Sequence, residues 1–296
     1  MADMKALPDA ERPKAGKAAN KFKQSIAAAI DKALAAAAPA EKPKTQTVAF
    51  DPSVPGRRPV VGHRHPIAQM IDRIKDIFGR MGFTVAYGPE IELARNNFEA
   101  LNIPADHPSQ DAFDTFYFAD DVVLRSQTST VQIRVMENQK PPVRIIAPGK
   151  TYRPDTVDAT HCFMFHQVEG LYVDEGVSMA DLKAVLTMFA REFFWPEVTI
   201  RFRPHFFPFT EPSVEVDVSC ALCAGKGCSV CSRKGWIEFG GAGMVDPNVF
   251  EVVGYDAEKY TGFAFGLGID RLVMMKYGID DIRRFFENDM RFLSQF

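Results

Sequence analysis

Four of the five cysteines lie close together, in the stretch SCALCAGKGCSVCSRKGW at residues 219 to 236. They form two Cys-x-x-Cys pairs separated by four residues: Cys220, Cys223, Cys228 and Cys231. Four thiolates at this spacing suit a tetrahedral Zn²⁺ ion with no open position, which is a structural rather than a catalytic site. In a reducing compartment they favour a metal over a disulfide, with free or reversibly oxidised thiols as the alternative. The stretch therefore predicts a structural Zn²⁺ ion.

Residues 144 to 173 combine aromatic, carboxylate, amide and guanidinium groups. The pattern predicts a strand, a polar loop and a second strand, on which Phe165, Gln167 and Glu169 share one face because side chains alternate. An aromatic face can stack a ring, the carboxylate and carboxamide can recognise an ammonium, and Arg153 can hold a phosphate with two hydrogen bonds. The alternative is a half-buried hairpin with a polar edge.

The side chains described above must be positioned by strands, which follow one another along the chain with few helices between them. Helical spacing predicts a helix from Pro66 to Gly82 and further helices at 128 to 138, 179 to 194 and 269 to 277. Strands are predicted at FTVAYG, AFDTFYF, VVLRSQTS, VRIIAPGKTYR, CFMFHQVEGLYV, VTIRFRPHFF, SVEVDVS, KGWIEFGGAGMV and TGFAFGLG. This order predicts an α+β domain over residues 61 to 296, built on a large antiparallel sheet.

Residues 1 to 60 differ from the rest because they are rich in Ala, Lys and Pro. One short helix is predicted at about 18 to 38, with an apolar stripe at every fourth residue: Phe22, Ile26, Ile30 and Leu34. The stripe needs a partner, and a solvated tether is the alternative. A linker is predicted at Pro52, Pro55, Gly56 and Pro59.

Composition excludes several classes of protein. No apolar run approaches the roughly 20 residues that span a bilayer, so no membrane partner is expected. The N-terminus lacks a secretory core and carries early acidic residues, which predicts a cytoplasmic location. Residues 1 to 65 hold 12 basic against 6 acidic residues, whereas the remainder holds 23 against 32, so the arm is the part suited to a polyanion. There is no Walker loop or GxGxxG motif, which excludes those modes of nucleotide binding.

Two segments resemble motifs of a known family. YRPDTVDATHCFMFHQVEG strongly resembles motif 2, and FAFGLGIDRLVMMKYGIDDIR motif 3, of class II aminoacyl-tRNA synthetases, in the form found in alpha subunits that charge phenylalanine. The helix and strand that end at Pro89 resemble motif 1, and RPHFFPFTEPSVEVDV is similar to the segment that builds the phenylalanine pocket. The resemblance covers residues 56 to 296. It implies a class II catalytic domain on an antiparallel sheet flanked by helices, with a short N-terminal helical arm.

The resemblance implies a reaction in which ATP and L-phenylalanine form phenylalanyl-adenylate, followed by transfer to the 3′ end of tRNA(Phe). It implies that Arg153 holds the α-phosphate, that His161 helps to grip the phosphates and that Phe165 stacks under adenine. Arg271 would face the γ-phosphate, where Gly266 and Gly268 allow close approach of the backbone. Glu211 is the candidate ligand for the Mg²⁺ that accompanies ATP, or else a structural carboxylate.

The amino-acid pocket follows from the same resemblance. Phe207 and Phe209 would pack edge-to-face on the substrate ring, although both could be plain core. Ala264 would lie at the pocket floor, where its size limits the substrate. The substrate ammonium would be received by Ser129, Gln167 and Glu169. Gln127 stands where the family often has histidine and would still donate and accept hydrogen bonds in the pocket.

The resemblance also implies partners: a larger beta subunit, in an assembly of two alpha and two beta chains, and tRNA(Phe). A non-catalytic synthetase-like regulator and a zinc-ribbon binding module are the alternative functions.

The four cysteines interrupt the family's sheet as a hairpin extension. We therefore expect the ion to lie beyond the sheet, since Arg153, Phe165 and Arg271 come from other segments. Its removal should lower thermal stability while sparing most ATP–pyrophosphate exchange.

Overall fold

The computed structural model describes residues 8–37, 53, 55–56, 62–220, 223–228 and 231–296. The chain divides into two compact units, Met1–Val60 and Val61–Phe296. In the first unit α1 (Arg12–Ala37) begins earlier than the predicted start at residue 18, and none of its residues is buried. The predicted end at residue 38 and most of the predicted linker lie outside the described residues.

The second unit holds the remaining helices and strands. Its helices are α2 (Pro66–Arg80), α3 (Ala94–Asn97), α4 (Ser129–Asn138), α5 (Met179–Phe193), α6 (Pro247–Val253), α7 (Ile269–Tyr277) and α8 (Met290–Leu293), with 3-10 turns η2 (Glu99–Leu101), η3 (Pro108–Gln110) and η4 (Ile282–Phe285). Its strands are β1 (Thr84–Val85), β2 (Ile91–Leu93), β3 (Tyr117–Ala119), β4 (Val122–Leu124), β5 (Val143–Tyr152), β6 (Met164–Asp174), β7 (Ile200–Phe207), β8 (Thr210–Ser219), β9 (Trp236–Val245) and β10 (Thr261–Gly268).

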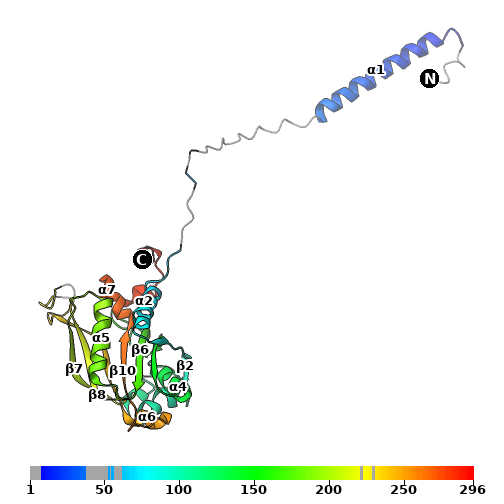
Figure 1. Cartoon of the computed structure of the whole chain (residues 1–296). Helices are drawn as coiled ribbons and strands as arrows, with labels where there is room; N and C mark the ends of the chain where they lie inside the picture. The colour runs from blue at the N-terminus through cyan, green and yellow to red at the C-terminus, as the bar shows by residue number, and fades with distance from the viewer. Residues whose placement is uncertain (1–7, 38–52, 54, 57–61, 221–222, 229–230) are drawn as a thin grey trace. The chain divides into compact units, whose positions relative to one another are not determined.

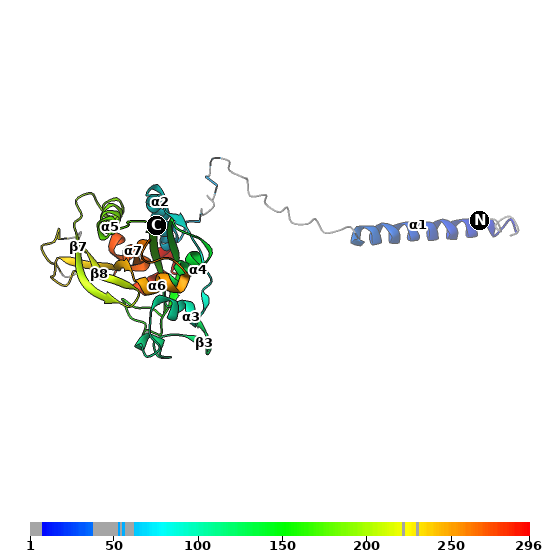
Figure 2. The same ribbon diagram turned by 60° about the horizontal axis from the view of Figure 1, so that its bottom comes forward.

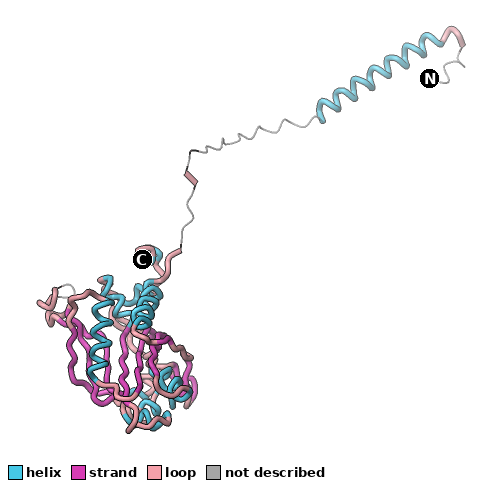
Figure 3. Tube along the Cα trace, viewed as in Figure 1, coloured by secondary structure: helices cyan, strands magenta, loops and turns pink. Residues whose placement is uncertain are grey.

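Seven strands form one large sheet in the order β1-β5-β6-β10-β9-β8-β7. Figure 3 shows the strands in magenta, with helices in cyan packed against them. All neighbours are antiparallel except β1 and β5, which pair in parallel, so the structure confirms the large antiparallel sheet and adds one parallel pair at its edge. The parallel pair is possible because the long segment between β1 and β5, which holds the small sheet and α4, returns the chain to the large sheet without a hairpin. A separate small sheet, β2-β4-β3, holds the two short strands that the sequence predicted beyond Pro89 together with β2, which it did not predict.

Three helices, α2, α5 and α7, pack over one face of the large sheet (Figure 1). Stacked aromatic rings fill the space between these layers, with ring centroids 4.7 Å apart for Phe78 and Phe189 and 5.2 Å apart for Phe78 and Phe265. This arrangement buries the apolar side of α2, whose spacing predicted the helix. The opposite face carries α4, α6 and the small sheet, and Figure 2 turns α3 and α6 toward the viewer.

Strand alternation assigns side chains to these two faces. In β6, Val168 packs in the core under the helices, so Gln167 and Glu169 lie on the opposite face, as predicted. In β10, Phe263 and Phe265 pack under the helices and Ala264 lies on the other face. The sequence thus predicts which face carries the polar groups.

Helix α6 was not predicted, although its end signals are present in the sequence. The Asp246 side chain accepts a hydrogen bond from the Asn248 N–H, Pro247 occupies the first turn, and Gly254 ends the helix in the left-handed conformation. Its short length hid it from a search for periodicity. Among the described residues, no helix combines the length and apolar character needed to cross a membrane.

Candidate active site

A cavity of about 570 Å³ opens on the face of the sheet opposite α2, α5 and α7. It brings together most of the predicted site residues, from five strands or strand ends and one helix: Gln127, Ser129, Arg153, Gln167, Glu169, Phe207, Phe209, Ala264 and Gly266. Residues separated by more than 100 positions in the sequence meet at this cavity, because they lie on or next to strands of one sheet. Phe165, His161, Gly268, Arg271 and Glu211 are not among the lining residues.

The polar end of the cavity is organised around Glu169, which is only 5% exposed. Its carboxylate accepts hydrogen bonds from the Thr128 N–H at 3.1 Å, from the Ser129 hydroxyl and from the Gln132 amide at 2.8 Å. Burial raises the pKa of Glu169 and outweighs these hydrogen bonds, which lower it. Gln132 was missed in the sequence, although it lies one turn after Ser129 on the predicted helix.

The side-chain oxygen Oε1 of Gln167 is buried and has no hydrogen-bond partner among the described residues. A buried acceptor without a donor is costly, so this atom indicates a place for a donor from a ligand. Gly266 faces the same two side chains: a Cβ atom there would lie 3.0 Å from Gln167 Nε2 and 3.3 Å from Glu169 Cγ. Gly266 therefore keeps the polar end of the cavity open.

The other end of the cavity is apolar. Phe207 and Phe209 both line it, with ring centroids 5.8 Å apart and planes only 10° from parallel. Ala264 lies beside them. The sequence missed further apolar lining residues from η2 and the turn after it, from α4 and α6, and from the end of β9: Leu101, Ile103, Met136, Val245 and Val249. Only tertiary packing brings these residues to the pocket, so spacing along the chain could not assign them.

Arg153 lies at the mouth of the cavity, just after β5. Its Nε donates to the Ser126 carbonyl at 3.2 Å, and its guanidinium carbon lies 5.3 Å from the centre of the Phe165 ring. Desolvation lowers the pKa of Arg153, and the charges of Asp155 and Glu169 oppose this shift. Because the side chain still reaches solvent through the cavity, the guanidinium stays charged at neutral pH. The Arg153 charge thus lies against an aromatic ring, in a cavity that also holds the buried Glu169 carboxylate.

Two of the predicted phosphate and metal residues, His161 and Glu211, are exposed. His161 lies in the loop between β5 and β6, where its Nδ1 is 3.1 Å from the Asp158 carboxylate. Glu211 is exposed at the start of β8. Neither lines a described cavity, so the structure alone does not bring them to the other site residues.

A second cavity, of about 340 Å³, lies by β7, β8 and β9. It is lined mainly by charged residues together with part of the cysteine stretch: Arg201, Arg203, Asp217, Cys231, Ser232, Lys234, Trp236, Ile237, Glu238 and Arg271. Cys231 and Arg271 thus line one cavity, although they come from different segments of the chain. Leu267 of β10 pairs with Gly240 of β9, so the β9 residues before Gly240 run beside the start of α7, which carries Arg271.

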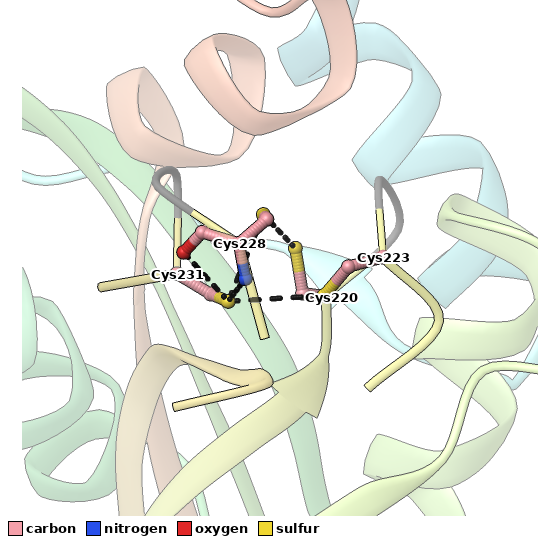
Figure 4. Close-up of side chains that lie close together, drawn as sticks. All are labelled: Cys220, Cys223, Cys228 and Cys231. Carbon is pink, nitrogen blue, oxygen red and sulfur yellow. Dashed lines mark hydrogen bonds between the residues drawn. The ribbon is translucent and has the colours of Figure 1, made fainter. Parts of the chain in front are cut away.

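The four cysteines of the 219–236 stretch point toward one another from two short loops (Figure 4). Their sulfur atoms lie within 4.8 Å of one another, and three pairs are 3.8 Å apart: Cys220–Cys228, Cys223–Cys231 and Cys228–Cys231. Sulfurs bound at about 2.3 Å to a tetrahedral ion lie about 3.8 Å apart. A disulfide needs about 2.05 Å. The geometry thus fits one tetrahedral ion better than two disulfides.

Backbone N–H groups surround these sulfurs. Gly227 N lies 3.1 Å from Cys223 Sγ, and Cys231 Sγ accepts from Cys228 N at 3.1 Å and from Gly235 N at 3.2 Å. These N–H groups, that of Cys228 foremost, lower the pKa of Cys231 to about 6. A thiolate is the form that binds metal. Gly225 and Gly227 have positive φ, which confirms that they allow the tight turns. Cys162 is a buried core thiol, as expected.

Comparison with known families gives matches along almost the whole chain. Residues 49–296 match the family described as "tRNA synthetases class II core domain (F)". Residues 1–44 match "Aminoacyl tRNA synthetase class II, N-terminal domain". The first match covers the unit that holds both cavities, and the second covers α1.

Several curated relatives are similar over nearly the full length. A protein named phenylalanine–tRNA ligase alpha subunit from Caldanaerobacter subterraneus subsp. tengcongensis is 56% identical, covering 99% of this chain and 87% of the relative. Relatives of the same name from Syntrophobacter fumaroxidans and Desulfosudis oleivorans are 55% and 57% identical over the same shares. The crystal structure of pyrrolysyl-tRNA synthetase from Desulfitobacterium hafniense aligns with a TM-score of 0.59 at 16% identity, over 79% of this chain and 77% of that one, which shows a shared fold.

Proposed function

The chain belongs to the class II aminoacyl-tRNA synthetase family, and from this premise we propose that it activates L-phenylalanine with ATP and charges tRNA(Phe). The observation that carries the choice of substrate is the cavity with one polar and one aromatic end. Glu169, Gln167 and Ser129 suit an ammonium, and Phe207 and Phe209 suit a phenyl ring.

The chemistry requires positioning and charge neutralisation more than covalent help from the protein. A carboxylate oxygen of phenylalanine attacks the α-phosphorus of ATP, the bond to the bridging oxygen breaks, and pyrophosphate leaves with its electron pair. Arg153 neutralises charge that develops on the α-phosphate oxygens, while Glu169 holds the ammonium so that the carboxylate faces Arg153. The fixed charges of the protein replace water around the reacting groups, and this lowers the activation barrier for adenylate formation.

The remaining ATP contacts are proposals from the family resemblance. Phe165 would stack on adenine, close to the Arg153 guanidinium that lies over its ring. Gly266 and Gly268 would let the strand approach the nucleotide, and Arg271 and His161 would bind its phosphates. Mg²⁺ bound to ATP would neutralise phosphate charge, and the exposed Glu211 carboxylate has the oxygen donors that this ion prefers.

We propose a beta subunit as the partner, in an assembly of two alpha and two beta chains, since the curated relatives are named alpha subunits. The arm helix α1, with its exposed Lys residues and its apolar stripe, is the candidate contact for tRNA(Phe). The molar mass of the co-expressed assembly tests the stoichiometry.

ATP–pyrophosphate exchange in the assembled enzyme tests the proposed activity. We expect exchange that depends on L-phenylalanine and proceeds much more slowly with tyrosine or leucine. A protein that assembles but shows no exchange with any amino acid would instead be a regulator.

We propose that the four cysteines hold one structural Zn²⁺ ion. A closed set of four thiolates leaves no position for substrate or water, so the ion would order the hairpin rather than act on the substrate. In the purified protein under reducing conditions we expect one zinc per chain. Cys223→Ser with Cys228→Ser should lose it and lower the melting temperature by roughly 4–8 °C, as for a loss of about 2 kcal/mol.

The control for this zinc prediction is Cys162→Ser, which lies outside the cluster and should keep the ion. Elemental analysis and calorimetric melting measure both results. Protein that contains no metal, or a double variant that melts at the original temperature, would show that the cysteines are free thiols.

Ala264 should set the size of the amino-acid pocket. Ala264→Gly adds room beside the substrate ring and should admit larger para-substituted phenylalanines, whereas Ala264→Val should raise the KM for phenylalanine itself. An apolar pocket discriminates one group by about 1–3 kcal/mol, so the expected changes are about 10- to 100-fold. Exchange rates with para-substituted analogues measure this, and an unchanged profile in both variants would place Ala264 away from the substrate.

A further inference from the structure

The second cavity lies beside the candidate active site on the same face of the sheet. Asp217 lies between Val216 and Val218, which both pack in the core under the helices, so its side chain lies on the opposite face, as Glu169 does. Strand β9 contributes Gly241 to the first cavity and Glu238 to the second. A spacing of about 3.3 Å per residue places these two positions about 10 Å apart. One extended ligand can therefore reach both cavities.

The charges of the second cavity favour an anion. Its lining holds four basic residues, Arg201, Arg203, Lys234 and Arg271, against the two acidic residues Asp217 and Glu238. Arg201 and Arg203 are already paired, because their Nε atoms lie 3.0 and 2.6 Å from Asp217 Oδ2, and Arg203 also pairs with Glu215.

Two cations of the second cavity remain available. In the part of the chain that the structure describes, no ion pair engages Lys234 or Arg271. Two unpaired cations that line one cavity repel each other, and a multiply charged anion between them removes that repulsion. The ligand that suits this arrangement is a polyphosphate.

Lys234 is held in place by the cysteine cluster. Its N–H donates to the Cys231 carbonyl at 2.9 Å, and the next residue, Gly235, donates to Cys231 Sγ at 3.2 Å. Gly235 also accepts a 2.9 Å hydrogen bond from the Cys220 N–H. Residues on both sides of Lys234 are thus fixed to the cluster.

The backbone of this segment needs such support. Ser232 and Arg233 have φ of 50° and 62°, in the left-handed region that residues with a side chain rarely adopt. Such a conformation persists only where the surroundings hold it. Removal of a metal ion from the cluster would release the segment, and Lys234 with it.

We propose that the cysteine hairpin completes a polyphosphate site: Lys234 and Arg271 together bind the terminal phosphates of ATP and the pyrophosphate product, and metal bound by the four cysteines fixes Lys234 there. This inference rests on the proposed function for the identity of the nucleotide, but not for the anion site itself. It replaces the expectation that loss of the metal would spare exchange. Loss of the metal would leave kcat unchanged and would lower the affinity for ATP.

Calorimetric binding of inorganic tripolyphosphate with Mg²⁺ to the assembled enzyme tests the site without any catalytic step. We expect Lys234→Ala to weaken binding about five- to tenfold. The matched control is Lys226→Ala, which removes the same charge from the same hairpin outside the cavity and should stay within twofold of the original protein. Cys223→Ser with Cys228→Ser should weaken binding as much as Lys234→Ala does, and adding Lys234→Ala to it should have little further effect.

In exchange assays, Lys234→Ala and the double cysteine variant should raise the KM for ATP by similar factors, whereas Lys226→Ala should not. Their kcat and KM for phenylalanine should stay within twofold. If Lys234→Ala binds tripolyphosphate as tightly as Lys226→Ala does, the inference is wrong. It is also wrong if the double cysteine variant, shown to be free of metal, keeps the original affinity. Failure of phenylalanine-dependent exchange in the original protein would instead overturn the proposed function and leave the calorimetric result standing.

Discussion

Replacement of Arg153 by alanine should reduce the rate of ATP–pyrophosphate exchange by about 100- to 1000-fold, because one charge-assisted donor to a developing oxyanion contributes roughly 3–4 kcal/mol. The effect should appear in kcat, since the α-phosphate gains charge contacts in the transition state rather than in the ground state. Steady-state exchange with varied ATP and phenylalanine measures it.

The fold should survive this change. The Arg153 side chain makes one hydrogen bond, to the Ser126 carbonyl, and a contact with the Phe165 ring, and it reaches solvent. Arg153→Lys keeps the charge but loses the fork of donors, and should recover only part of the rate. Arg191→Ala, which removes an exposed arginine of α5 that lines neither cavity, is the matched control. Near-normal adenylate formation in Arg153→Ala would remove Arg153 from the phosphate site.

The sequence predicted the strands of the large sheet well because each long strand carries its own pattern. Alternation placed Gln167 and Glu169 on one face and Val168 on the other, and the structure confirms this. The short elements were harder to predict. β2 has three residues and α6 has seven, too few for a period to emerge.

The apolar wall of the candidate site was beyond prediction for a different reason. Leu101 and Val249 meet at the cavity only because η2 and α6 pack together below the sheet. Nothing in their local sequence distinguishes such a lining residue from ordinary core. That Cys231 and Arg271 line one cavity was beyond prediction for the same reason, since it depends on the register of β9 and β10.

Replacement of Glu169 by glutamine should raise the KM for phenylalanine about 30- to 100-fold, since a charge-assisted hydrogen bond to a buried charge contributes roughly 2–3 kcal/mol. The KM for ATP should change little. Glu137→Gln, on the exposed end of the same helix α4 that supplies Ser129 and Gln132, is the matched control and should leave both KM values unchanged. Exchange kinetics and the melting temperature of each variant measure the two effects separately.

The dependence on pH gives the sharper test of Glu169. Burial raises the pKa of this carboxyl group above its ordinary value, so in the free enzyme the folded state holds its proton at a pH where the unfolded chain has lost it. The stability of the free protein therefore falls as pH rises through the interval between the two pKa values, because the folded state must then hold a buried charge. A substrate ammonium beside the carboxylate offsets that cost and lowers the pKa of Glu169 again.

As the pH is reduced through the raised pKa of Glu169, the carboxylate becomes protonated, and the KM for phenylalanine should increase. In Glu169→Gln this increase should be absent, whereas in Glu137→Gln it should persist. A Glu169→Gln enzyme with an unchanged KM and an unchanged pH profile would show that the ammonium binds elsewhere in the cavity.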